Sequence, residues 1–367
     1  PVPAGIDRFD IDLATEYLSV WADRWGVTLD AVLALGADPT DAPSAFNMAA
    51  LCLRASARAN GVSKLHGTVS RKLFSEVPGG SEIGSVTNGV HARTWVMPRL
   101  QVAFDEALGA GWEHGEPQAW ERVDRLDDDA IRALRRGGGE DLRTLVAERT
   151  GGSIDPDALI VGFARRFATY KRANLLLRER EALTSLLADD DRPVQFVFAG
   201  KAHPADVPGK AVLADVVAFA ATPQARGRFL FVPDYDIAVA RAMYAGCDVW
   251  LNNPVRPREA SGTSGEKSAL NGGLNCSISD GWWDEMADGH NGWTIPASAA
   301  ADPADRDDEE AAAVLDLLTD EIVPEFHAGG APWSTAWCDR VRHNWRTLGP
   351  LVTAGRMVRD YERTLYG

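Results

Sequence analysis

Cysteine is scarce in this sequence, and basic residues are outnumbered by acidic ones, 38 to 53. Its four cysteines are widely separated over 367 residues and form no CxxC pair. Neither a zinc site nor a disulfide framework is indicated, so we expect core thiols in a reducing compartment and no metal. The net charge of −15 argues against nucleic acid or an anionic membrane surface as a partner, because both reward positive charge.

Long apolar runs and targeting signals are also missing. No stretch approaches the length of a membrane span, and the opening PVPAGIDRFD has no basic segment followed by an apolar one. We therefore expect a cytoplasmic protein. A Walker A phosphate loop is absent as well, since GTSGEKS has the wrong glycine spacing and HPADVPGKA has proline in place of the first glycine. This disfavours a nucleoside triphosphatase.

What is present is the composition of an ordinary globular protein, with 45% apolar and 25% charged residues. The length allows two cores, so we expect two domains. From about residue 158, short apolar runs alternate with helical patterns, which predicts βαβ units on a parallel sheet and an α/β fold. The expected strands cover residues 159–164, 194–200, 228–233, 247–253, 274–279 and 292–295. The expected helices cover 173–188, 211–221, 236–246 and a segment that contains Lys267.

Conspicuous polar groups follow the first four of these strands. They are Arg165 and Arg166 after the first, Lys201 and His203 after the second, Tyr235 after the third, and residues 252–267 after the fourth. Ligands of parallel sheets bind beyond the carboxyl ends of the strands, so we expect one crevice to collect these groups. Four cations within residues 165–172 of an acidic chain favour an anion site over the alternative of a solvated helix face.

The stretch EASGTSGEKSALNGG, residues 259–273, places a glycine-rich loop before a helix that carries Lys267. Such a loop lets backbone approach a ligand, and a helix N-terminus behind it favours an anion. The alternative is an ordinary helix start capped by Ser261 or Thr263, with Lys267 in water. These residues alone leave both interpretations open.

The chain before residue 158 has a mostly helical pattern. Asn-Gly pairs predict loops or turns at residues 60–74 and 83–98, and Pro98 makes the second a plausible domain junction. The acidic stretch ADPADRDDEEAA, residues 301–312, is interpreted as a solvated surface linker that leads into a capped helix.

Several segments together carry a family resemblance, and they occur in the family's order over nearly the whole chain. They are NGVSKLHG, TNGVHARTW, GFARRFATYKR, GKAHP, DVWLNNPVRPREASGTSGEKSALNGGLN and DGWWDE. With them the sequence resembles the α-glucan phosphorylases, the family of glycogen, starch and maltodextrin phosphorylases, and is similar to their bacterial branch. The segment around Lys267 is the most specific of the six.

The resemblance implies a two-lobed glycosyltransferase-type (GT-B) fold that holds pyridoxal 5′-phosphate in its carboxyl-terminal lobe. Residues 1–90 are then a mostly helical remnant of the amino-terminal lobe, and 91–340 a complete Rossmann-like lobe. Residues 341–367 would be a terminal helix that packs back toward the first lobe. Family chains are more than twice as long as this one, and a homo-oligomer is possible in the full-length protein.

The resemblance also assigns roles to individual residues. Lys267 stands where the cofactor forms its imine, and Arg166 and Lys171 stand where the substrate phosphate binds. The cofactor phosphate is implied to contact Arg165, Thr263 and the backbone of Ser264, with Tyr235 and Trp95 packed nearby. The glucosyl unit is implied to be held by Asn88, Glu259, Ala260, Ser261 and Gly262.

The implied reaction is phosphorolysis of a terminal α-1,4-linked glucose with retained configuration, which yields glucose 1-phosphate and a shortened glucan. The working group of the cofactor in this family is its phosphate, set beside the substrate phosphate. Two adjacent phosphates need fixed positive charge around them, which accounts for the cations. The reaction needs no carboxylate pair, so a two-carboxylate glycosidase is disfavoured.

Two positions depart from the family pattern. Glu266 replaces the neutral residue that usually precedes the cofactor lysine, and its carboxylate would perturb the cofactor unless it points away. Asp236 replaces a basic residue of animal-type relatives. Two alternatives remain: a nucleotide-sugar glucosyltransferase similar to glycogen synthase, which would not need Lys267, and a fragment that binds cofactor or glucan without turnover.

Overall fold

The computed structural model describes residues 5–367 and contains one six-stranded parallel sheet. Its strand order is β10-β9-β8-β5-β6-β7. The strands are β5 (Leu159–Ala164), β6 (Val194–Ala199), β7 (Phe229–Val232), β8 (Val249–Asn252), β9 (Leu274–Ile278) and β10 (Gly292–Ile295). Every strand expected from the alternating pattern is present, which confirms the α/β fold class. The chain adds β6 and β7 on one side of β5 and then returns to the other side, where β8, β9 and β10 follow. The direction of winding therefore reverses at the neighbouring strands β5 and β8.

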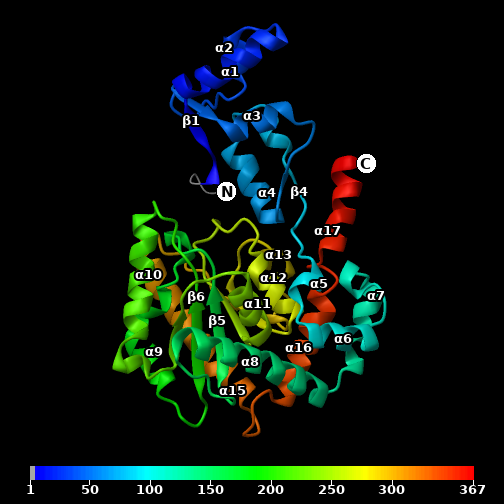
Figure 1. Cartoon of the computed structure of the whole chain (residues 1–367), viewed down its shortest axis with the longest axis vertical. Coiled ribbons are helices and arrows are strands. Elements are labelled where there is room, and N and C mark those ends of the chain that lie inside the picture. Colours follow the sequence, from blue (N-terminus) through cyan, green and yellow to red (C-terminus); the bar gives the residue numbers. More distant parts are fainter. Residues whose placement is uncertain (1–4) are drawn as a thin grey trace.

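Helices cover both faces of this sheet, so its strands are buried on both sides. Alternate residues of β5 belong to opposite cores. Ile160 packs with residues of α8 (Asp128–Thr150) and α11 (Ile237–Gly246), and Val161 and Phe163 pack with residues of α9 (Arg180–Leu187) and α14 (Pro303–Asp316). The helices around the sheet are α8 (Asp128–Thr150), η6 (Leu175–Glu179), α9 (Arg180–Leu187), α10 (Val207–Ala220), α11 (Ile237–Gly246), α12 (Thr263–Leu270), α13 (Trp283–Met286), α14 (Pro303–Asp316), η8 (Leu317–Ile322), α15 (Val323–Phe326) and α16 (Thr335–Leu348). The central body in Figure 1 is this layered unit.

The first part of the chain forms a smaller helical unit beyond one end of this body (Figure 1). Its elements are β1 (Arg8–Asp10), α1 (Ile11–Trp25), α2 (Leu29–Ala34), β2 (Ala45–Asn47), α3 (Met48–Ala55), β3 (Asn60–Gly61), α4 (Lys64–Leu73), η2 (Gly80–Glu82) and β4 (Gly84–Ser85). The first four residues of the predicted amino-terminal remnant lie outside the described residues. One face of α1 exposes apolar side chains, among them Tyr17, Trp21 and Trp25.

A second group of short helices joins the two parts. It contains α5 (Ala92–Trp95), α6 (Pro98–Ala107), η3 (Trp112–His114), α7 (Pro117–Trp120) and η4 (Glu121–Arg125). The 3-10 turns η5 (Thr169–Lys171) and η7 (Pro223–Ala225) lie in the sheet unit. Among the described residues, no helix is both long and apolar enough to cross a membrane.

The carboxyl-terminal segment breaks after α16 and continues as α17 (Ala354–Tyr361) and η9 (Glu362–Tyr366). In Figure 1 this segment rises from the central body beside the first unit. Val90 forms a parallel bridge with Thr353, and Arg58 donates to carbonyl oxygens of the last residues. The terminal segment therefore ties the first unit to the sheet unit.

Three expectations from the sequence are wrong. Residues 60–74 are not a loop, because Ser63 caps helix α4 and β3 pairs with β4. The acidic stretch 301–312 is not a linker, because Asp302 caps α14 and Glu310 is buried in an ion pair with Arg172. Cys52 is exposed on α3, whereas the other three cysteines are buried as expected.

Candidate functional site

A buried ion-pair cluster lies beyond the carboxyl ends of β5 and β8. Arg165 follows β5, and its guanidinium contacts the side-chain oxygen of Asn252, the last residue of β8. Arg165 also donates to Glu259 Oε2 at 2.6 Å, and Lys171 Nζ lies 3.0 Å from the same oxygen. The switch in winding between these neighbouring strands is where parallel sheets bind ligands. The structure thus brings together three of the residues predicted from the sequence.

The charges of this cluster perturb each other. Burial and the nearby charge of Arg165 lower the pKa of Lys171 to about 8, although Glu259 opposes the shift. Burial alone would raise the pKa of Glu259, but Arg165 and Lys171 outweigh it and lower that pKa. Glu259 is therefore ionised at neutral pH, and Lys171 keeps a proton that a bound anion would help to retain.

Arg166 is exposed at the edge of this cluster, in contrast to the buried Lys171. Its charge contributes to the lowered pKa of Lys171, and its side chain is hydrogen-bonded to Tyr170. Burial raises the pKa of Tyr170, so the phenol remains a neutral hydrogen-bonding group. Arg166 is thus the solvent-facing cation of the group.

Helix α12 begins directly after the glycine-rich loop, as expected. Its N-cap is Gly262, which has φ 95° and provides no side-chain cap. The alternative of a helix start capped by Ser261 or Thr263 is therefore wrong. Ser264 accepts a hydrogen bond from Trp250 Nε1 at 3.2 Å through its hydroxyl. Gly265 N–H donates to the carbonyl oxygen of Gly262 at 3.0 Å, and the N–H groups of Thr263 and Ser264 precede this first bond of the helix.

Lys267 points toward aromatic rings rather than into water. Its Nζ lies 4.0 Å from the centroid of the Trp95 ring and 5.6 Å from that of Tyr244. Tyr244 is hydrogen-bonded to Tyr235, and both lie within the electrostatic reach of Arg165. Burial lowers the pKa of Lys267, which favours the neutral and nucleophilic amine. The predicted cofactor residues Trp95, Tyr235 and Lys267 thus share one environment.

The Glu266 carboxyl group contacts Ser261 of the glycine-rich loop and stays within the electrostatic reach of Lys267. Its Oε1 lies 3.5 Å from Ser261 Oγ, and its Oε2 is buried without a partner among the described residues. Burial raises the pKa of Glu266 to about 8 despite the nearby charges of Arg356 and Lys267. The side chain is therefore mostly neutral at pH 7 and brings no full negative charge to the Lys267 side.

Contacts from the first unit and from α17 reach the residues expected to hold sugar and their neighbours. Ser63 Oγ donates to the carbonyl oxygen of Ala260 at 2.8 Å. Arg356 of α17 donates to the carbonyl oxygens of Thr87 and Asn88 at 2.6 and 2.7 Å. The backbone on both sides of the predicted sugar site is therefore fixed by residues distant in sequence.

Sequence reasoning missed several members of the site. They are Tyr244, Trp250, Asp280 and Arg356. Trp250 and Asp280 lie in motifs given above, but nothing in their spacing distinguishes them. Lys201 and His203 were expected to join the cluster, yet both are exposed and none of the ion pairs described above involves them.

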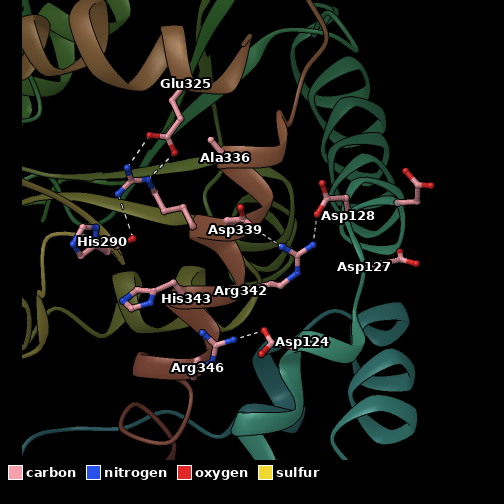
Figure 2. A pocket seen from close by; sticks show the side chains of 12 residues that line it. Asp124, Asp127, Asp128, His290, Glu325, Ala336, Asp339, Arg342, His343 and Arg346 are labelled. Carbon is pink, nitrogen blue, oxygen red and sulfur yellow. Dashed lines mark hydrogen bonds and ion pairs between the residues drawn. The ribbon is translucent and has the colours of Figure 1, made fainter. Parts of the chain in front are cut away.

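A large cavity of about 1080 Å³ lies elsewhere, between α16 and the start of α8 (Figure 2). Its arginines are already paired, Arg342 with Asp128 and Arg346 with Asp124. His343 Nε2 lies 2.7 Å from Asp288, and Glu325 pairs with an arginine of α16. None of the residues that the sequence singled out lines this cavity. We therefore place the candidate functional site at the carboxyl ends of β5 and β8.

A doubly covered parallel sheet with a cation-rich cluster at its winding switch is the arrangement in which doubly wound α/β proteins bind ligands, and it agrees with a glycosyltransferase-type (GT-B) fold. The family model described as carbohydrate phosphorylase matches residues 32–290, and the chain belongs to that family. Glycogen phosphorylase of Mycobacterium tuberculosis (strain ATCC 25618 / H37Rv) is 47% identical over 398 residues, which cover 100% of this chain and 46% of the relative.

Two further relatives have lower sequence identity. Maltodextrin phosphorylase of Thermococcus litoralis is 36% identical, and the match covers 100% of this chain and 45% of the relative. Glycogen phosphorylase of Aquifex aeolicus is 35% identical, with 100% and 56% covered. The chain thus spans about half the length of the curated relatives it matches.

Proposed function

We propose that this chain forms part of an α-glucan phosphorylase. The enzyme would release glucose 1-phosphate from the non-reducing end of an α-1,4-glucan with inorganic phosphate and retained configuration. The observation that carries the proposal is the cluster in which Arg165 and Lys171 share the carboxylate of Glu259 at the carboxyl edge of the sheet. Relatives named glycogen and maltodextrin phosphorylase support it.

The residues present fit pyridoxal 5′-phosphate. Arg165 Nε is a buried donor without a partner among the described residues, which suits a missing anion. The uncapped start of α12 at Thr263 and Ser264 offers further donors, and Lys267 lies against Trp95. We propose that Lys267 attaches the cofactor and that Arg165, Thr263 and Ser264 hold its phosphate. Bound there, the cofactor would supply a phosphate group able to exchange a proton with the substrate phosphate.

The residues of the chain then have separate tasks. Arg166 and Lys171 bind and orient the substrate phosphate, and their charges offset the repulsion between two neighbouring phosphates. Glu259 does not act as a general acid, because the two cations hold it ionised. With Asn88, Ala260, Ser261 and Gly262, it is proposed to position the glucosyl unit so that phosphate, and not water, captures the cationic centre.

Borohydride reduction in the presence of pyridoxal phosphate is expected to label Lys267. The reason is that its ε-amino group is partly buried, has a lowered pKa and faces the Trp95 ring. Peptide mapping by mass spectrometry locates the label, and Lys267→Ala should abolish both the label and the cofactor absorbance. A label on Lys171 or Lys201 instead would contradict the assignment.

Replacement of Arg166 by alanine is expected to weaken phosphate use rather than glucan binding. In an active full-length form, the loss should be about 3 kcal/mol of transition-state stabilisation, comparable to loss of one charged oxyanion donor. Steady-state kinetics with varied phosphate and varied maltodextrin measures both. The control is Arg226→Ala, since Arg226 precedes β7 at the opposite edge of the sheet. A change in glucan affinity alone would refute this role.

A further inference from the structure

A short turn after β9 contacts the loop that carries Glu259. The turn covers residues 279–282, and the two segments follow neighbouring strands of the sheet. The carboxylate of Asp280 accepts the backbone N–H of Glu259 at 2.9 Å and that of Gly281 at 2.8 Å. Trp282 N–H donates to the carbonyl oxygen of Ser261, also at 2.9 Å. The turn thus forms hydrogen bonds with two residues of the loop, Glu259 and Ser261.

The contact is close enough to require glycine. Gly281 has φ 57°, and a Cβ there would lie 2.2 Å from the carbonyl oxygen of Ser261. Gly262 likewise faces Trp282, with a virtual Cβ 3.3 Å from the indole Cδ1. The turn and the loop therefore pack backbone against backbone, which leaves little room for the loop to shift independently.

We propose that Asp280 is a positioning residue that fixes Glu259 for the site. Asp280 is 1% exposed and its bond with the Glu259 amide is buried, so loss of this acceptor leaves a buried N–H group without its partner. The same residue carries the carboxylate shared by Arg165 and Lys171. Asp280 thus acts on the cation cluster through the backbone of Glu259, without contacting substrate itself.

The charges around Asp280 give this role a pH dependence. Burial, together with the neighbouring charge of Glu259, raises the pKa of Asp280 to about 6, and Arg256 opposes the shift. Arg256 is itself paired with Asp284 of α13 at 2.9 Å. Both oxygens of Asp280 face N–H groups, so a proton on either one removes an acceptor. The hydrogen bond from Glu259 N–H to Asp280 is therefore expected to weaken as pH falls through about 6.

The first test follows the Glu259 amide by NMR in the chain labelled with ¹⁵N-glutamate, with Glu259→Gln to assign the resonance. We expect the amide to shift with a midpoint near pH 6. Asp280→Asn keeps one acceptor oxygen but does not titrate. In this variant the chemical shift of the Glu259 amide should therefore stay constant with pH. The inference is overturned if the chemical shift of the Glu259 amide changes neither with pH nor with the Asp280→Asn substitution. This outcome does not depend on whether the chain binds glucose 1-phosphate.

The second test uses glucose 1-phosphate and rests on the proposed function. At neutral pH, Asp280→Ala should weaken its binding by about tenfold, the effect of losing one hydrogen bond to a charged group, as measured by calorimetry. Asp280→Asn should bind nearly as well as the unaltered chain, which a purely structural defect would not predict. Equal binding by all three chains overturns the inference. If the Glu259 amide titrates but the unaltered chain does not bind glucose 1-phosphate, the proposed sugar site fails and the positioning role stands.

Discussion

Glu266→Gln is expected to remove a loss of stability that the chain suffers as pH rises from 4.5 to about 8. Folding raises the pKa of Glu266 from 4.5 to about 8, because the side chain is fully buried. The folded state therefore keeps a proton that the unfolded state releases above pH 4.5. The stability this provides is complete below pH 4.5 and is lost as pH rises to about 8.

The size of the effect follows from the gap between the two pKa values. About 3.5 pH units at about 1.4 kcal/mol per unit give up to about 5 kcal/mol between pH 4.5 and pH 8. Glutamine has the same shape and no charge to bury, so the stability of Glu266→Gln relative to the unaltered chain should rise over this interval. Urea unfolding at a series of pH values measures the difference.

The matched control is Glu181→Gln, which changes an exposed glutamate on the first turn of α9. Its pH profile should follow that of the unaltered chain. Glu266→Met should behave as Glu266→Gln does, because the effect comes from the removed charge and not from a particular hydrogen bond. Parallel profiles for the unaltered chain and Glu266→Gln would show that burial does not keep Glu266 protonated.

Arg172→Met is expected to destabilise the fold by about 3–5 kcal/mol, the usual result of removing one partner of a buried ion pair. The Arg172 side chain is 4% exposed and pairs with Asp307 at 2.8 Å and with the buried Glu310. It also donates to the carbonyl oxygens of Asn253 and Pro254 at 2.9 Å. Methionine fills much of the volume but leaves Glu310 and both carbonyls without this donor.

Arg178→Met provides the comparison. Arg178 forms an exposed ion pair with Asp308, which lies on α14 beside the partners of Arg172. An exposed pair contributes about 1 kcal/mol or less, so this variant should unfold close to the unaltered chain. Adding Glu310→Gln to Arg172→Met should recover part of the loss, since it removes the unpaired charge. Equal unfolding free energies for the two arginine variants would disprove the buried role of Arg172.

The Arg172 contacts also show why the basic segment could be only partly interpreted from sequence. Four cations within eight residues predicted an anion site, and Arg165 and Lys171 do meet at Glu259. Arg172 instead turns into the core, with φ 48°, and pairs with a helix that starts more than a hundred residues later. No local pattern distinguishes Lys171, which faces the site, from Arg172, which binds the carbonyl oxygens of the loop after β8.

The sequence alone determined the features that depend on local order. Alternating apolar runs predicted the six strands, since strand and helix periods differ, and the glycine-rich loop predicted a helix that carries Lys267, whereas the structure decided that this helix starts without a side-chain cap. Only the tertiary structure decided which charges share a buried environment. Glu266 turns toward Ser261 and Asp280 reaches the Glu259 amide because segments distant along the chain pack there. Burial and through-space charge, which shift the pKa values at this site, arise only after that packing.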